Sequence, residues 1–137
     1  MTRKDFQALA RTRLADAEAL LQAGRFDGAF YLLGFAVECG LKACIARLIR
    51  RHEFPDKQMT IDSYSHDLSK LVRTAGLESA LNAEMDADPY FYKNWLVAKD
   101  WSVESRYSVP GNLKAEALRN AVNHRRHGLM RWIRQRW

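Results

Sequence analysis

Cysteine and histidine are scarce in this chain of 137 residues, which has two cysteines and four histidines. Cys39 and Cys44 lie five apart in a predicted helix, too far apart to form a disulfide with each other, and their spacing matches no metal motif. The histidines belong to no cluster with cysteines or carboxylates, so we expect no metal and no other cofactor. We interpret His52, His66 and His127 as surface or capping residues. Two free buried thiols favour a reducing, cytoplasmic location.

A long uncharged hydrophobic run is also missing. The N-terminal segment MTRKDFQALARTRLADAEALL is amphipathic from the start and does not have the residue order of a signal peptide. The most hydrophobic segment, AFYLLGFAVECGLKACIARLI, is about long enough to span a bilayer. It contains Glu38, Lys42 and Arg47, however, so we expect a buried helix of a soluble protein and no membrane association.

Strand signals are few, and there is no internal repeat, low-complexity tract or linker to a second domain. Hydrophobic periodicity predicts helices at 2–23, 27–51, 65–76, 77–89, 89–101 and 112–136, with a polar connection at 52–64. Thr2, Ser65 and Asn112 are expected N-caps, and Gly24 and Gly76 expected helix ends. Residues 1–137 are therefore predicted to form one all-α domain, an up-and-down bundle of four to six helices. The segment 27–51 is apolar nearly all round, which is typical of a central helix.

Glu38 and Lys42 interrupt this apolar helix at a spacing of four, so they are expected to pair with each other. A buried carboxylate needs a cation or hydrogen-bond donors, and a structural ion pair is therefore the main interpretation of Glu38. On a continuous helix over 112–136, Arg125 lies near the middle of the apolar stripe. We expect its charged end to reach solvent or to join the Glu38 pair.

Positive charge is concentrated at the C-terminal end. The chain has a net charge of +6, and residues 113–137 contain seven lysines and arginines but one acidic residue, Glu116. Such a concentration predicts a surface for phosphates or for an acidic partner, and Arg126, Arg131 and Arg134 are the candidate nucleic-acid contacts. A helix that serves solubility and packing alone is the other interpretation.

A group of aromatic residues fits a packed core better than a base-stacking platform: Tyr90, Phe91, Tyr92, Trp95 and Trp101.

Four segments, in this order, resemble the HEPN domains of bacteria and archaea: AFYLLGFAVECGLKACIARL, SHDLSKLV, WLVAKDWSVESRY and LMRWIRQRW. The resemblance covers nearly the whole chain and implies a helical bundle that is commonly a homodimer. HEPN proteins include metal-independent endoribonucleases, many of them toxins of toxin–antitoxin pairs with a small nucleotidyltransferase. Others have lost catalysis and serve as RNA-binding or accessory modules. The resemblance thus implies a role on RNA or a nucleotide.

Active HEPN proteins share an arginine followed four to six residues later by a histidine, and Arg119 with His124 fits this spacing. The resemblance implies that His124 transfers a proton and that Arg119 stabilises the phosphate. About one such pair is expected by chance in a chain this rich in arginine, and Arg47 with His52 is a second match. The alternative is a non-catalytic interaction or dimerisation module whose basic helix contacts an acidic partner.

Two details bear on the catalytic interpretation. Steps of 100° along a continuous helix place Arg119 and His124 about 140° apart, so they could share a site only across a two-fold partner or an extended substrate. Some HEPN toxins have a tyrosine two residues after the histidine that the nucleotidyltransferase modifies, whereas this chain has Arg126 there.

Overall fold

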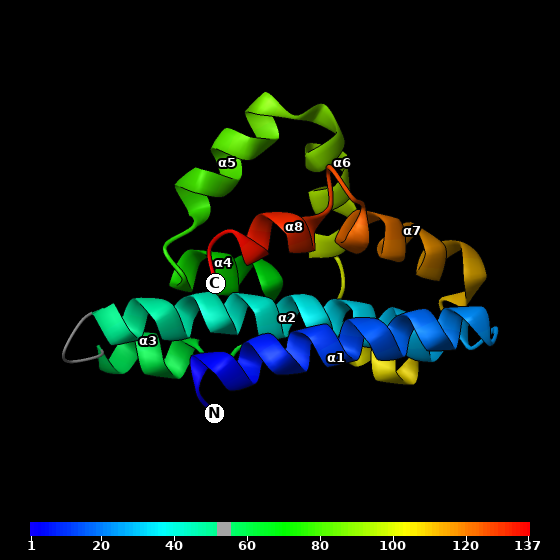
Figure 1. Cartoon of the computed structure of the whole chain (residues 1–137), viewed down its shortest axis with the longest axis horizontal. Helices are drawn as coiled ribbons and strands as arrows, with labels where there is room; N and C mark the ends of the chain where they lie inside the picture. Colours follow the sequence, from blue (N-terminus) through cyan, green and yellow to red (C-terminus); the bar gives the residue numbers. More distant parts are fainter. Residues whose placement is uncertain (52–55) are drawn as a thin grey trace.

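The computed structural model describes residues 1–51 and 56–137, and the predicted all-α class is confirmed, since these residues contain no strand (Figure 1). The elements in chain order are α1 (Arg3–Gln22), α2 (Phe26–Arg51), α3 (Lys57–Asp62), α4 (Leu68–Thr74), α5 (Glu78–Ala87), α6 (Pro89–Lys99), the 3-10 helix η1 (Val103–Tyr107), α7 (Gly111–Asn123) and α8 (Leu129–Arg134).

Helices α1 and α2 form an antiparallel hairpin along the long axis of the molecule (Figure 1). Thr2 caps α1 as predicted, and Asp5 completes a capping box: Thr2 Oγ1 accepts from the Asp5 amide at 3.2 Å, and Asp5 Oδ2 accepts from the Thr2 amide at 2.8 Å. The hairpin turns at Gly24, whose φ of 74° lies in the left-handed region that favours glycine.

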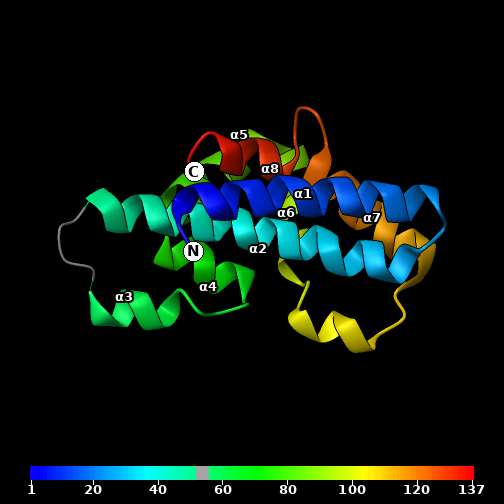
Figure 2. The same ribbon diagram turned by 60° about the horizontal axis from the view of Figure 1, so that its bottom comes forward.

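Helix α2 is the centre of the fold, as its apolar sequence predicts. It packs against α1, α4, η1, α7 and α8. Its side chains are buried on several sides, among them Leu33, Val37, Leu41 and Ile45. Figures 1 and 2 together show α7 and α8 on one side of the α1–α2 hairpin and α3 on another. Within the described residues, no helix combines the length and the apolar character needed to cross a bilayer.

The short helices differ in detail from expectation. A helical turn, α3, lies in the segment predicted to be a polar connection, of which residues 52–55 fall outside the described part. Asp67 caps α4 by accepting from the Lys70 amide at 2.9 Å, while the expected cap, Ser65, instead accepts from the Asp67 amide at 3.1 Å. The left-handed Gly76 follows α4 as predicted, with φ 71°.

The predicted helix over 112–136 is broken, which is the main correction to the secondary structure. Helix α7 ends at Asn123, and α8 begins only at Leu129. Asn112 does not cap α7; it lies in its first turn, after Gly111 with φ 83°. This break and the additional α3 raise the number of α-helices in the described residues to eight, above the four to six expected.

Candidate nucleic-acid interface

The turn between α7 and α8, residues 124–128, is organised by the imidazole of His124. Its Nδ1 accepts hydrogen bonds from the backbone amides of Arg126 at 3.1 Å and His127 at 3.0 Å. In a continuous helix these amides would donate to carbonyls one turn earlier, so the imidazole replaces the helical partners. Gly128 completes the turn because a Cβ there would lie 2.4 Å from the His124 carbonyl oxygen. Figure 2 shows this connection projecting beyond the neighbouring helices.

The hydrogen bonds of His124 also assign its tautomer. Because Nδ1 accepts from two amides, the ring proton of neutral His124 is on Nε2. The ring therefore offers its surroundings a donor, while its lone pair is engaged within the turn. To take up a proton, as the resemblance implies, His124 would have to give up both amide bonds.

Arg119 lies on α7 and contacts α1. Its Nε donates to Glu18 Oε1 at 2.7 Å. The hydrogen bond and the charge of Glu18 raise the pKa of Arg119, and the charge of Glu116 adds to this effect. The same two carboxylates line a hollow of about 380 Å³ beside the guanidinium, together with Leu21 and Gln22. The surroundings of Arg119 therefore carry more negative than positive charge, which disfavours a phosphate.

The two residues of the Arg119/His124 pair thus have separate surroundings. Arg119 is bound to α1, whereas His124 has left the helix and serves the turn. The angle of about 140° between Arg119 and His124 was calculated for a continuous helix. It does not apply, because the backbone of His124 is not helical, with φ −59° and ψ 133°. The second spacing match, Arg47 with His52, involves a residue outside the described part of the chain; Arg47 itself donates to the Arg136 carbonyl at 3.1 Å.

Four exposed arginines lie on the turn and on α8: Arg125, Arg126, Arg131 and Arg134. We call them the arginine stripe. None of them forms an ion pair with an acidic side chain in the described ranges 1–51 and 56–137. Arg131 donates to the Arg126 carbonyl at 3.3 Å, which connects α8 to the turn. Arg136 is different, because its guanidinium lies 4.4 Å from the centroid of the Trp132 ring.

Arg125 corrects an expectation. A continuous helix predicts that Arg125 lies over the apolar stripe and that its charged end either reaches solvent or joins Glu38. The break in the helix places Arg125 on the exposed turn instead, where it reaches solvent. Glu38 is buried and its Oε1 bonds instead to Lys42 Nζ at 3.0 Å and to His66 Nδ1 at 2.8 Å. The predicted Glu38–Lys42 pair is therefore confirmed, with His66 in place of Arg125 as the third member.

A second histidine of the turn has a partner that the sequence did not reveal. His127 Nδ1 lies 2.6 Å from Asp88 Oδ2, and the His127 carbonyl accepts from Asn94 Nδ2 at 2.8 Å. Asp88 is also the N-cap of α6, where its Oδ1 accepts from the amides of Tyr90 and Phe91 at 3.0 and 3.3 Å. An aspartate before a proline is a sequence signal for the start of a helix. The contact of Asp88 with His127, 39 residues away, has no such signal.

The ionisation of Asp88 is fixed by these bonds. Burial acts to raise the pKa of its carboxyl, but the hydrogen bond from His127, the two amides and the charge of His127 outweigh it. The net effect is a pKa below its usual value, so Asp88 is a carboxylate at neutral pH. In its neutral form, His127 therefore donates to Asp88 through Nδ1 and has its lone pair on Nε2.

The aromatic residues of α6 divide between core and surface. Phe91, Trp95 and Trp101, which follows α6, are buried, as the core interpretation predicts. Tyr90 and Tyr92 are exposed. The Tyr90 ring lies 4.9 Å from that of His127, and the His127 ring lies 5.0 Å from that of His124. An exposed tyrosine therefore lies beside the basic turn.

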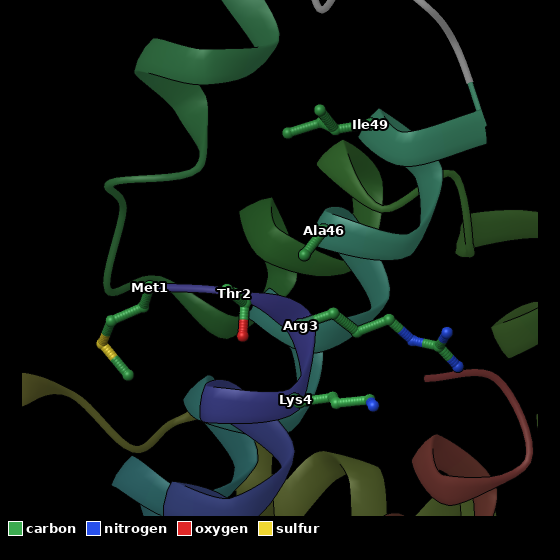
Figure 3. Close-up of a pocket in the computed structure, with 6 residues that line it drawn as sticks. All are labelled: Met1, Thr2, Arg3, Lys4, Ala46 and Ile49. Atoms are coloured by element: carbon green, nitrogen blue, oxygen red, sulfur yellow. The ribbon is translucent and has the colours of Figure 1, made fainter.

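A separate cavity lies at the start of α1. It has a volume of about 500 Å³ and is lined by Met1, Thr2, Arg3, Lys4, Ala46 and Ile49 (Figure 3). In Figure 3 the side chains of Arg3 and Lys4 extend to the same side, away from Met1. Arg3 Nε donates to the Trp137 carbonyl at 3.0 Å, so its charge is engaged within the fold.

Within the described residues, no three histidine, cysteine or carboxylate side chains lie close enough together to hold a metal ion. Comparison of the chain with models of protein families, with curated proteins and with solved structures found no match.

Proposed function

We propose that the protein is a HEPN-like module that binds RNA through the arginine stripe. The observation that carries this proposal is the set of exposed guanidinium groups at Arg125, Arg126, Arg131 and Arg134, which have no acidic partner in the described ranges. Guanidinium groups bind phosphate oxygens with charge-assisted, often bidentate hydrogen bonds. A run of four free cations on one turn and helix fits a row of backbone phosphates.

The neighbouring aromatic residue supports single-stranded RNA as the ligand. Tyr90 is 64% exposed, and its ring contacts that of His127 in a tilted arrangement, at the edge of the turn that carries Arg125 and Arg126. Unpaired bases stack on exposed aromatic side chains, and this mode combines with phosphate contacts in many RNA-binding sites. A partner protein with an acidic surface would use the arginines but would have no need of Tyr90.

Cleavage by Arg119 and His124 has less support than binding. The guanidinium of Arg119 is bonded to Glu18, and the Nδ1 of His124 accepts two amide bonds. A phosphate at Arg119 would meet the negative charges of Glu18 and Glu116. The homodimer and the small nucleotidyltransferase partner remain proposals that follow from the resemblance to HEPN proteins.

The test is the binding of a fluorescein-labelled single-stranded RNA of mixed sequence, followed by fluorescence anisotropy. Replacing all four residues of the arginine stripe by alanine should weaken binding about 100-fold at moderate salt, as expected for the loss of several phosphate contacts. The matched control replaces four exposed cations elsewhere: Arg25, Lys57, Arg106 and Lys114. Equal losses in both variants would show a non-specific charge effect and would refute the proposal.

A further inference from the structure

Two adjoining hollows lie between the start of α1, the last turns of α2 and the connection from α3 to α4. The first is the cavity of about 500 Å³ in Figure 3, and the second, of about 220 Å³, shares Met1, Ala46 and Ile49 with it. The other residues that line the second hollow are Phe6, Lys42, Ile45, Ser63 and Tyr64. We call the two hollows together the α1–α2 trough. Their combined size is that of sites that bind small organic molecules.

One wall of the α1–α2 trough is a single face of α2. Four residues of this wall follow one another at spacings of three and four, which place their side chains on the same side of a helix: Lys42, Ile45, Ala46 and Ile49. Figure 3 shows Ala46 and Ile49 projecting from successive turns of α2 to one side. The wall is therefore an apolar strip that begins at an ammonium group. From Lys42 to Ile49 it is about 10 Å long, at about 1.5 Å per residue.

The remaining walls contribute further apolar side chains, some of which are accessible. Phe6 of α1 is partly buried against the core. Met1 and Tyr64 are each 75% exposed, although both line the hollow. Large apolar side chains that stay exposed around a concave apolar surface are a common mark of a binding site.

The charged side chains that line the trough are cationic. They are Arg3, Lys4 and Lys42, and among the described residues no aspartate or glutamate lines it. Lys42 is largely buried, and one of its three donor hydrogens is used by Glu38 at 3.0 Å. Glu38 therefore offsets the charge of Lys42, but Arg3 and Lys4 leave an excess of positive charge. The trough thus favours a ligand with an apolar body and a negatively charged end.

We propose that the α1–α2 trough binds a small carboxylate with an unbranched hydrocarbon chain of roughly ten carbons, whose extended length matches the apolar strip of about 10 Å. Lys42 holds the carboxylate, and the chain lies along Ala46 and Ile49. Tyr64 and Met1 cover the chain at the rim. The trough shares no residue with the arginine stripe, so this inference does not depend on the binding of RNA.

The first experiment titrates the whole chain with sodium decanoate in a calorimeter. The comparison ligands are 1-decanol and decyltrimethylammonium bromide, which have the same chain with no charge and with a positive charge. Decanoate should bind saturably at one site. We expect decanol to bind about tenfold more weakly, as for the loss of one charge-assisted hydrogen bond. The cationic ligand should bind more weakly still, because Arg3 and Lys4 repel it.

Two substitutions test where the ligand lies. Ala46→Phe fills the apolar strip and should abolish saturable binding of decanoate, whereas the matched control Ala83→Phe, on the exposed side of α5, should bind as wild type does. Lys42→Gln keeps a hydrogen-bond donor for Glu38 but removes the charge. It should weaken decanoate about tenfold and leave decanol unchanged, a difference that a merely structural defect would not produce. Far-ultraviolet circular dichroism checks that each variant keeps its helices.

Methyl resonances of labelled isoleucine locate the ligand independently of any substitution. Addition of decanoate to wild-type protein should shift the methyl signals of Ile45 and Ile49, which line the trough. The signal of Ile133, which is buried on α8, should not move.

Several results would overturn the proposal. These are the absence of saturable decanoate binding by wild type, equal affinity for the three ligands, and decanoate binding that persists in Ala46→Phe. Shifts at Ile133 without shifts at Ile45 and Ile49 would also overturn it. If Lys42→Gln does not fold, the comparison of the three ligands and the isoleucine shifts still decide the question.

Discussion

The replacement of Gly34 by alanine tests the packing around the central helix. Gly34 lies in α2, and a Cβ built on it would fall 2.1 Å from two carbons of the Trp101 indole ring and 2.2 Å from its Nε1. Atoms at that distance overlap, so the ring would have to move. Trp101 is buried, and Tyr31 lies beside it with ring centroids 6.0 Å apart. There is little room for such a movement.

The magnitude follows from two opposing effects. Alanine in place of glycine inside a helix is favourable by about 1 kcal/mol. Overpacking of a well-packed core costs about 1–3 kcal/mol, and displacement of a buried tryptophan approaches the 3–5 kcal/mol of its truncation. Because the clash involves the rigid indole ring, we expect the cost of overpacking to exceed the gain in helix propensity. Gly34→Ala should lower the free energy of unfolding by about 2 kcal/mol.

Urea denaturation followed by far-ultraviolet circular dichroism measures this change. Gly28→Ala is the matched control in the same helix, since its Cβ would meet Leu20 Cδ1 at 3.4 Å, an ordinary contact. That variant should be neutral or stabilised by up to about 1 kcal/mol. Trp101→Leu should relieve the clash, so the double variant should lose less than the sum of the two single changes. A neutral or stabilising Gly34→Ala would refute the packing described for α2 and Trp101.

Three further predictions concern buried and ionised groups. Glu38→Gln should lower the free energy of unfolding by about 3 kcal/mol, because it leaves Lys42 without its buried partner; thermal denaturation checks this, and a loss under about 0.5 kcal/mol would contradict the buried ion pair. Burial raises the pKa of the Cys39 and Cys44 thiols to about 12, so Ellman's reagent at pH 8 should label them only after unfolding, and rapid labelling of native protein would be the opposite result. Asp88 has a pKa below its ordinary value of 3.8, so its contribution to stability is present above about pH 4 and is lost as pH falls through the lowered pKa. The stability difference between wild type and Asp88→Asn should therefore shrink between pH 5 and pH 3, and an unchanged difference would contradict it.

Local patterns predicted much of the fold. The spacing of Thr2 and Asp5 predicts a capping box, and the all-round apolar character of 27–51 predicts the central helix; both are confirmed. The spacing of four between Glu38 and Lys42 predicts their ion pair, which is also confirmed. Each of these features depends on residues within one or two helical turns, so the sequence contains the information directly.

The break in the last predicted helix was missed because periodicity continues across it. Leu118, Ala121, Val122 and Leu129 keep a helical spacing, although the backbone leaves the helix at His124. The available signal was Gly128 inside an otherwise helical segment, which marks a possible turn. The sequence does not show that the His124 imidazole accepts hydrogen bonds from two backbone amides. These bonds replace helical ones only when the side chain adopts a particular geometry, which spacing does not encode.

The partner of His127 was beyond sequence reasoning for a different reason. Asp88 and His127 are 39 residues apart, and their contact depends on the packing of α6 against α7 and α8. His66 reached Glu38 in the same way, across 28 residues. Tertiary contacts of this kind decide which histidines are oriented by a carboxylate.

The central claim is that the arginine stripe binds RNA phosphates, and the salt dependence of binding tests it most directly. For single-stranded nucleic acid, the logarithm of the binding constant falls by about 0.7 per phosphate contact for each unit in the logarithm of salt concentration. Removal of Arg125, Arg126, Arg131 and Arg134 should therefore make this slope shallower by about 3, while the control variant keeps the wild-type slope. Equal slopes in wild type and the arginine-stripe variant would contradict the account.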